Sequence, residues 1–264
     1  MRRADNANSS IVPALDPGVT WLSRLSARSA LYTEFRLLID AELEPLASKA
    51  YCARILEENS LARASGAGRK KLWQELKSRY LLDRELPLFA AFWKEWRRCQ
   101  SEAERGLTAY ILLALNDRLV ADLGTEWLFG YLRRAPAELR TEDVRCFIER
   151  AGQTHPEVES WTEHTRAAVA KKYLASIRDF GLARGRVKKV TICPALYGAP
   201  VRLLIRALQL VGVRPLDLIQ ASVFRLLALD EKSVIDALGE LNRLGELRFR
   251  MQGDVIELNL GEEA

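Results

Sequence analysis

The chain has 264 residues, of which 48% are hydrophobic and 28% charged, with a formal net charge of +5 at pH 7. This is the composition of an ordinary globular protein with enough apolar residues for one large domain or two smaller ones. The excess of cations is compatible with an anionic partner but does not require one, because 35 acids are spread among the 40 bases.

The sequence lacks the signals of exported, membrane-spanning and zinc-binding proteins. The N-terminus has no apolar signal region, and the longest apolar stretch, YILLALNDRLVADL, is interrupted by Asn116, Asp117 and Arg118. The four cysteines are far apart, without a Cys-x-x-Cys pair, and neither histidine is near one. We therefore expect a cytoplasmic protein that uses no cofactor and no structural zinc.

The first 195 residues predict an arm, a helical bundle and a linker. Residues 1–30 are rich in Ser, Asn, Pro and Arg, and we expect a flexible arm. Helical spacing of apolar residues then predicts a bundle over 31–182. Its expected helices cover 33–43, 46–59, 67–81, 86–99, 101–123, 141–152 and 156–182. Residues 183–195 form a basic linker whose end, KVTICP, has strand character.

The last part of the chain changes pattern. Three helical stretches, 200–212, 215–229 and 230–245, are followed by two alternating strands, ELRFRM and VIELNL, around Gln252-Gly253-Asp254. Three helices followed by a β-hairpin is the order of a winged helix-turn-helix. We therefore expect a mainly all-α protein, with an N-terminal helical bundle and a C-terminal winged helix-turn-helix over 196–264.

The segment from Ser60 to Tyr80, SLARASGAGRKKLWQELKSRY, places cations where a helix disfavours them. Arg69, Lys70 and Lys71 open a helix whose N-terminus already carries partial positive charge. A docked polyanion would make these charges favourable, because the free N–H groups and the cations would then bind the same phosphate. We therefore predict DNA contacts at the start of this helix, by Arg63, Ser65, Arg69, Lys70 and Lys71.

Other cations are candidates for the same surface. Lys171 and Arg178 share one side of the longest helix, and four more cations follow in the linker, Arg184, Arg186, Lys188 and Lys189. In the first wing strand, alternation puts Arg248 and Arg250 opposite Leu247, Phe249 and Met251, which we expect on the core side. We interpret Arg97-Arg98 and Arg133-Arg134 as ordinary solvated helix ends, since cations suit a helix C-terminus.

Signatures of catalysis are missing, and we expect no enzyme activity. GAGRKK lacks the spacing of a phosphate-binding Walker loop, and there is no Gly-x-Ser-x-Gly motif. No single stretch offers the clustered acids of a metal-dependent nuclease. The predicted recognition helix carries Glu231, Asp236 and Glu240, which match a DNA groove poorly.

A known family shares the order and spacing of these segments. ILEENSLARASGAGRKKLWQELKSRYLL, AYILLALNDRLVADL, TEDVRCFIE and the block over 156–182 occur in that order before a basic stretch. Over about residues 32–260 the chain resembles the BrxA family, small components of bacterial BREX phage-defence systems sometimes described as similar to the RNA-binding antitermination factor NusB. Some members carry an inner-membrane label, against which the hydropathy argues here.

The resemblance implies a non-enzymatic accessory factor of defence that binds DNA. We expect double-stranded DNA as its partner, held mainly through backbone phosphates, possible contacts with other BREX components, and no membrane. Two alternatives stay open: a protein-interaction scaffold of the defence complex, and an RNA-binding factor of the antitermination type.

Overall fold

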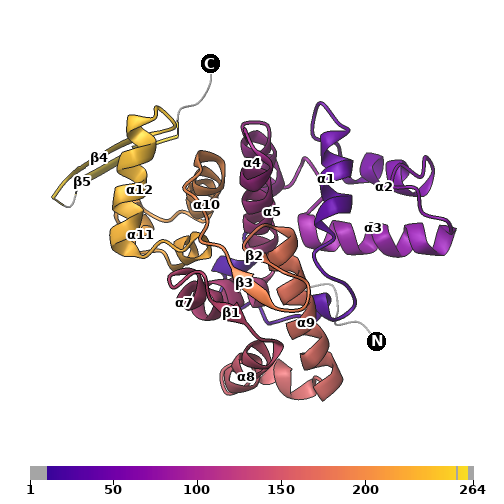
Figure 1. The fold of residues 1–264 in the computed structure, drawn as a ribbon. Coiled ribbons are helices and arrows are strands. Elements are labelled where there is room, and N and C mark those ends of the chain that lie inside the picture. The colour runs from indigo at the N-terminus through magenta and orange to yellow at the C-terminus, as the bar shows by residue number, and fades with distance from the viewer. Residues whose placement is uncertain (1–10, 254, 261–264) are drawn as a thin grey trace.

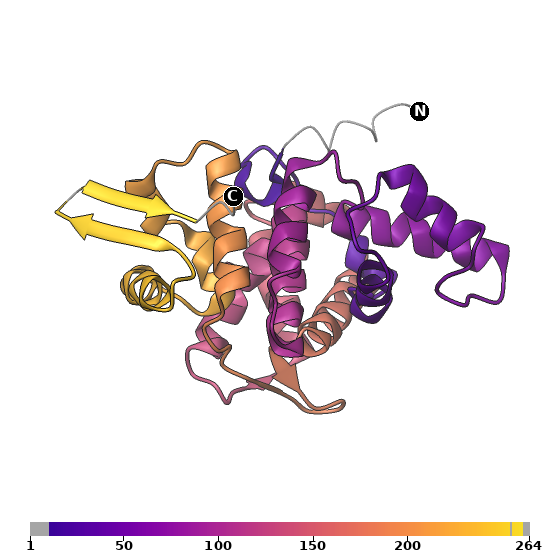
Figure 2. The ribbon, with the colours of Figure 1, turned by 90° about the horizontal axis from the view of Figure 1, so that it is seen from above.

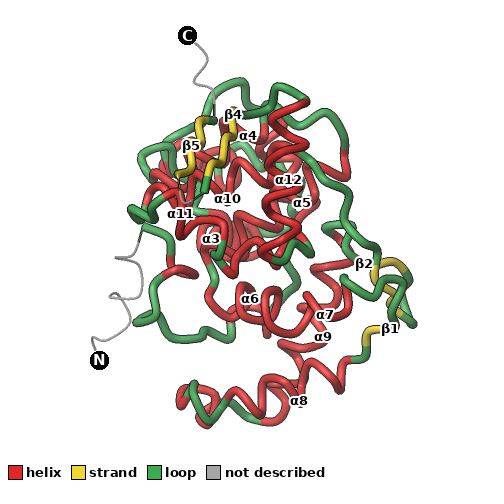
Figure 3. The backbone as a smooth tube through the Cα atoms, turned by 90° about the vertical axis from the view of Figure 1, so that its left-hand side faces the viewer, coloured by secondary structure: helices red, strands yellow, loops and turns green. Residues whose placement is uncertain are grey.

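The computed structural model describes residues 11–253 and 255–260. Helices dominate these residues, and their strands form two small sheets (Figure 3). The α-helices are α1 (Tyr32–Asp40), α2 (Ser48–Leu56), α3 (Gly66–Tyr80), α4 (Pro87–Trp96), α5 (Glu102–Asn116), α6 (Arg118–Asp122), α7 (Phe129–Leu132), α8 (Thr141–Ala151), α9 (Glu163–Asp179), α10 (Gly198–Leu210), α11 (Pro215–Ile219) and α12 (Glu231–Arg243). The strands are β1 (Glu138–Leu139), β2 (Ala183–Arg184), β3 (Lys189–Thr191), β4 (Arg248–Gln252) and β5 (Val255–Asn259).

The centre of the molecule is built around α5, which is apolar on nearly all sides and buried along most of its length. Helices α4 and α10 pack on it and on each other (Figure 1). Helix α10 was expected to open the C-terminal segment, yet it lies in the same core as the bundle. One continuous cluster of buried apolar side chains runs from Val12 to Leu260.

Residues 11–30 differ from the flexible arm that composition suggested. Val12, Trp21 and Leu25 are buried in the core, and Trp21 Nε1 donates a hydrogen bond to Asp122 Oδ2 at 2.8 Å. A few large apolar side chains are enough to fix this segment although its average composition is polar. Residues 1–10, the rest of the expected arm, lie outside the described residues.

Two of the expected helices are broken within apolar stretches, and a third, 156–182, divides into a 3₁₀ turn, η4 (Pro156–Ser160), and α9. The stretch 101–123 divides at Asp117, whose extended backbone ends α5 and whose Oδ1 caps α6 by accepting from Val120 N at 3.3 Å. A π-helical segment, η3 (Leu123–Leu128), follows α6. The stretch 215–229 divides into α11 and a 3₁₀ turn, η5 (Ser222–Leu227). Apolar spacing continues across both breaks and therefore conceals them.

Part of the expected linker forms a sheet. Strand β3 pairs antiparallel with both β1 and β2, so a hairpin of residues 183–191 joins a strand from before α8. Thr191 N donates to Ala137 O at 2.9 Å at the edge of this sheet. The strand character of KVTICP is confirmed for Lys189–Thr191.

The C-terminal segment ends in a hairpin that projects from the body (Figure 1). Asp230 caps α12 by accepting from Ser233 N at 2.9 Å, and α12 packs against β4. In the strand before the turn, Leu247 and Phe249 are buried as expected, but Met251 is 47% exposed. The expected core position of Met251 is wrong because the strand has passed the edge of the core by that residue.

Candidate nucleic-acid interface

Helix α9 carries two of the predicted cations away from the core. Thr162 caps the helix, and its Oγ1 accepts a hydrogen bond from Thr165 N at 3.1 Å. The apolar side, which includes Tyr173, is buried. Lys171 and Arg178 lie two turns apart on another side, where Lys171 is exposed and Arg178 is half-buried.

The hairpin of β2 and β3 brings further cations beside α9. Helix α9 packs against β2. At the turn, Gly185 has a φ of 94°, and a Cβ there would lie 2.0 Å from the Lys188 carbonyl oxygen. The turn therefore requires glycine. Arg184, Arg186 and Lys188 are exposed on it.

Lys189 shows that the helix and the hairpin act on one another electrostatically. Burial lowers the pKa of its ammonium group, and the charges of Arg178 and Lys171 lower that pKa further, while Asp179 opposes them. Lys189 Nζ donates to Arg186 O at 3.1 Å. Cations separated in the sequence are thus close enough in space to repel one another.

We call these six side chains the α9–hairpin cluster: Lys171, Arg178, Arg184, Arg186, Lys188 and Lys189. Within this cluster, Arg178 forms an ion pair with Asp179 at 2.6 Å. Its cations come from two elements, and sequence analysis had identified each of them without showing that they meet.

The start of α3 is less open to phosphate than the sequence suggested. Ser65 caps the helix, and its Oγ accepts from Gly68 N at 3.1 Å, so one of the free N–H groups is already occupied. Arg63 forms an ion pair with Glu34 of α1. Arg69 is half-buried, and its Nε is buried without a hydrogen-bond partner.

Two predicted cations at this helix start remain fully available to solvent. Lys70 and Lys71 are exposed, and both follow the first turn of α3. Of the predicted group at this helix start, Lys70 and Lys71 are exposed, whereas Arg69 is half-buried and Arg63 is paired with Glu34.

Arg248 and Arg250 are exposed on β4, as alternation predicted. Arg250 lies opposite Glu257 of β5 in the register of the hairpin. On α12, Asp236 is exposed and Glu240 forms an ion pair with Arg243. The C-terminal segment therefore mixes cations with acids, whereas the α9–hairpin cluster is predominantly basic.

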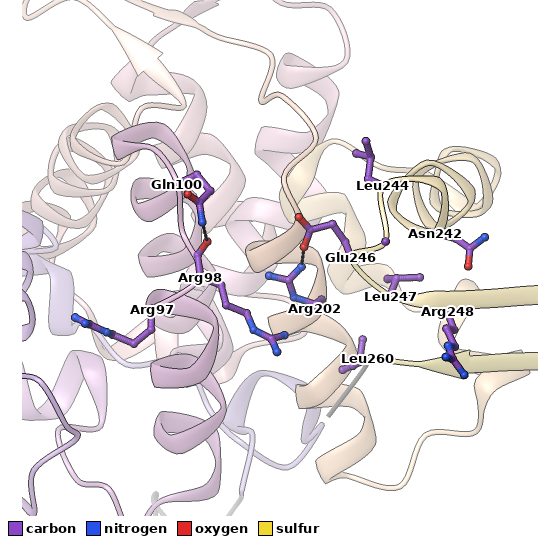
Figure 4. Close-up of a pocket in the computed structure, with 11 residues that line it drawn as sticks. Arg97, Arg98, Gln100, Arg202, Asn242, Leu244, Glu246, Leu247, Arg248 and Leu260 are labelled. Carbon is purple, nitrogen blue, oxygen red and sulfur yellow. Dashed lines mark hydrogen bonds and ion pairs between the residues drawn. The ribbon is translucent and has the colours of Figure 1, made fainter. Parts of the chain in front are cut away.

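A groove of about 740 Å³ separates the end of α4 from the turn between α12 and β4 (Figure 4). Arg98 and Arg248 line it from opposite sides, together with the buried Arg202. Arg202 Nε donates to Glu95 Oε2 at 2.6 Å and its Nη1 pairs with Glu246. The sequence did not predict that Arg98 and Arg248 line the same groove, because they are remote in the chain and no local motif joins them.

The other arginines interpreted as solvated helix ends, Arg97, Arg133 and Arg134, differ in their contacts. Arg97 lies next to Arg98 at the end of α4 and also lines the groove (Figure 4). Arg133 forms an ion pair with Asp230 at 3.1 Å, and Arg134 lies over the ring of Tyr131. Their interpretation as structural surface residues agrees with these contacts.

The predicted site residues fall into three separate parts of the molecule. Seen from above in Figure 2, the strands β4 and β5 lie at the left, α2 and α3 at the right, and the hairpin of β2 and β3 at the lower edge. The α9–hairpin cluster is therefore the largest group of predicted cations that the fold assembles at one place.

Two further properties concern membranes and metals. In the part of the chain that the structure describes, no helix combines the length and apolar character needed to cross a bilayer. Within residues 11–253 and 255–260, no group of three or more His, Cys, Asp and Glu side chains is arranged to hold a metal ion.

The fold and the cluster define a mainly helical protein with a basic surface built from one helix and one short hairpin. A sequence model described as BrxA matches residues 20–208. The chain therefore belongs to the BrxA family, which associates it with BREX phage defence. The match contains α3, α9 and the hairpin and ends within α10, short of the C-terminal segment. No curated protein matches the chain.

Proposed function

We propose that this chain is a non-enzymatic component of BREX phage defence that binds duplex DNA through the phosphate backbone. The observation that carries the proposal is the surroundings of Lys189, whose pKa is lowered by burial and then by the nearby charges of Arg178 and Lys171. Like charges held together in this way are unfavourable for the protein alone. A polyanion at the same place would relieve their repulsion.

The chemistry of the cluster favours phosphate over base recognition. Its members are lysines and arginines on a helix side and a four-residue turn, without the asparagine and glutamine side chains that commonly read adenine. Contacts of this kind position a protein on a duplex but carry little sequence information. We therefore propose binding with little sequence preference.

The C-terminal segment supports a second contact of the same kind. Its order, α10, α11, η5, α12 and the β4–β5 hairpin, fits the proposal of a winged helix-turn-helix. Arg248 and Arg250 are placed to touch phosphates, about 7 Å apart along the strand. Because α12 carries the acids Asp236 and Glu240, we assign that helix a structural role rather than a contact with DNA.

One observation favours a scaffold instead. Before the projecting hairpin Leu244 is 65% exposed, and near its turn Met251 is 47% and Val255 is 74% exposed. Apolar side chains at the edge of a segment with mixed charge suit a protein partner better than DNA. In this alternative the C-terminal segment docks another protein of the defence complex.

A binding experiment separates these functions. Fluorescence anisotropy with duplex DNA, single-stranded DNA and structured RNA of equal length should give the highest affinity for the duplex. The double variant Lys171→Gln with Lys189→Gln should lose about 10-fold or more in affinity. Lys49→Gln with Lys94→Gln removes two exposed charges elsewhere and serves as the control. Equal losses in both double variants, or no duplex binding at low salt, would contradict the proposal.

A further inference from the structure

Helix α3 combines cations and an aromatic ring on one solvent-facing side. Lys70 lies three and four residues before Trp73 and Gln74, and Lys77 lies four and three residues after them, so these side chains neighbour one another on the helix surface. Lys70, Gln74 and Lys77 are exposed and Trp73 is half-buried. The core side of the helix includes the buried Leu76, and the half-buried Trp73 packs partly against the same core.

This face forms one wall of a pocket of about 400 Å³. Leu81 ends α3 in the left-handed conformation, with a φ of 55°, and turns the chain back toward the helix. Asp83 and Leu86 of the following loop form the second wall, and Arg24 closes one end. A pocket of this size is sufficient for a small flat ligand.

The ring of Trp73 is the flat surface of this pocket. Lys77 Nζ lies 5.7 Å from the ring centroid, so the ring already attracts a cation. The lysine is exposed and its side chain is flexible, which allows a neutral flat group to replace it over the ring. The displaced ammonium group then remains within reach of an anion attached to that group.

The polar groups around Trp73 match the rest of a nucleotide. Lys70 and Lys77 lie one turn to either side of the ring, at positions suited to a phosphate. Asp83 Oδ1 accepts from Glu85 N at 3.2 Å, which leaves the second carboxylate oxygen for an exocyclic amino group of a base. The Gln74 amide can both donate to and accept from a base edge.

We propose that this pocket binds one unpaired nucleotide, with its base stacked on Trp73 and its phosphate held by Lys70 or Lys77. Its natural source is an unpaired position in the DNA that the chain binds, so the inference rests on the proposed function for that source. Lys71, the residue after Lys70, is also exposed and widens the basic surface of α3. A strand lying along α3 would meet lysines, then the aromatic ring, then lysine again.

The test compares a blunt duplex with the same duplex carrying a 3′ tail of deoxyadenosines. Base–aromatic stacking predicts that the full-length protein binds the tailed duplex about 10-fold more tightly. Trp73→Leu keeps an apolar side chain but removes the ring, and it should abolish this preference while the affinity for the blunt duplex stays unchanged. Trp73→Phe should retain most of the preference. Lys77→Gln, which leaves the packing intact, should reduce it, with Lys94→Gln as the matched control.

Free dAMP distinguishes the two sources of the nucleotide. Saturable quenching of tryptophan fluorescence by dAMP, absent in Trp73→Leu, would assign the pocket to a free nucleotide, whereas quenching by the tail alone would assign it to a strand. An equal loss for tailed and blunt duplexes in Trp73→Leu, or no dependence of either probe on Trp73 and Lys77, would overturn the proposal. If the blunt duplex fails to bind but the tail still requires Trp73, the proposed duplex binding fails and the pocket stands.

Discussion

Glu95 is a carboxylate with no exposed surface, at the junction of α4 and α10. It accepts hydrogen bonds from Arg202 Nε at 2.6 Å and from Arg206 Nε at 2.7 Å. Burial lowers the pKa of Arg202, but the charges of Glu95 and Glu246 outweigh burial and raise that pKa above its ordinary value. The buried Glu95 carboxylate therefore links α4 to α10 through its bonds to Arg202 and Arg206, and this link depends on the opposite charges of the partners.

Replacement of Glu95 by alanine leaves Arg202 buried without its main partner. We expect Glu95→Ala to lower the free energy of unfolding by about 3–5 kcal/mol, because an uncompensated charge remains in the interior. Urea denaturation measures the change. Glu240→Ala removes an acid from a surface pair with Arg243 and should have little effect. Comparable losses in the two variants would show that the buried pair has no special role.

The lowered pKa of Lys189 predicts how duplex affinity depends on pH. Its pKa is lowered by burial and by Arg178 and Lys171, so it loses its proton at a lower pH than an ordinary lysine. Phosphate contact requires the charged form. Duplex affinity should therefore begin to fall at a lower pH than the deprotonation of an ordinary lysine, whose pKa is about 10.4, would cause, and Lys189→Arg, which stays charged, should reduce that fall. An identical pH profile in Lys189→Arg, measured by anisotropy, would exclude Lys189 from the contact.

At the scale of the residue, the sequence identified charges but not their partners. The region from Leu61 to Leu72 contains no acid, which made its cations look unpaired. In the fold, Glu34 comes from α1 and neutralises Arg63. Long-range ion pairs of this kind leave no mark in local spacing, and they decide which cations remain available for a ligand.

At the scale of the element, the β2–β3 hairpin is the part on which the cluster depends. Gly185→Ala adds a methyl group that collides with the Lys188 carbonyl oxygen at a backbone conformation that disfavours side chains. We expect this variant to weaken duplex binding by about 10-fold although no charge is removed, because the cations of the turn are displaced.

The matched control for the hairpin is Gly239→Ala. Gly239 lies in α12, where an added Cβ meets no atom within 4 Å. This substitution should leave duplex binding unchanged and raise helix stability, since alanine is the better helix former. Anisotropy titrations of both variants decide the matter, and normal binding by Gly185→Ala would mean that the turn does not position the contact.

Elements were predicted well where spacing is regular and poorly where a single residue interrupts it. The four-residue spacing of Leu72, Leu76 and Tyr80 predicted α3 almost to its ends. The break at Asp117 was not predicted, because a capping aspartate inside an apolar stretch resembles an ordinary polar position. The β2–β3 hairpin was treated as a linker since its strands are two and three residues long.

At the scale of the whole molecule, the predicted cations divide among α3, the α9–hairpin cluster and β4. The family match contains the first two groups and ends before β4. Every cation of the α9–hairpin cluster could be predicted from the sequence. Their closeness in space could not, because it requires α9 and the hairpin to pack together. The lowered pKa of Lys189, caused by burial and by the neighbouring charges of Arg178 and Lys171, arises only in the folded chain.

The most direct measurement is the dependence of duplex affinity on salt concentration, for the unmodified protein and for Lys171→Gln with Lys189→Gln. Each lysine that contacts a phosphate releases about one counterion, so the plot of log affinity against log salt should be steep. The double variant should lower its slope by about two units, whereas Lys49→Gln with Lys94→Gln should leave the slope unchanged. A slope that is the same in the unmodified protein and in both double variants would contradict the account that the α9–hairpin cluster holds DNA.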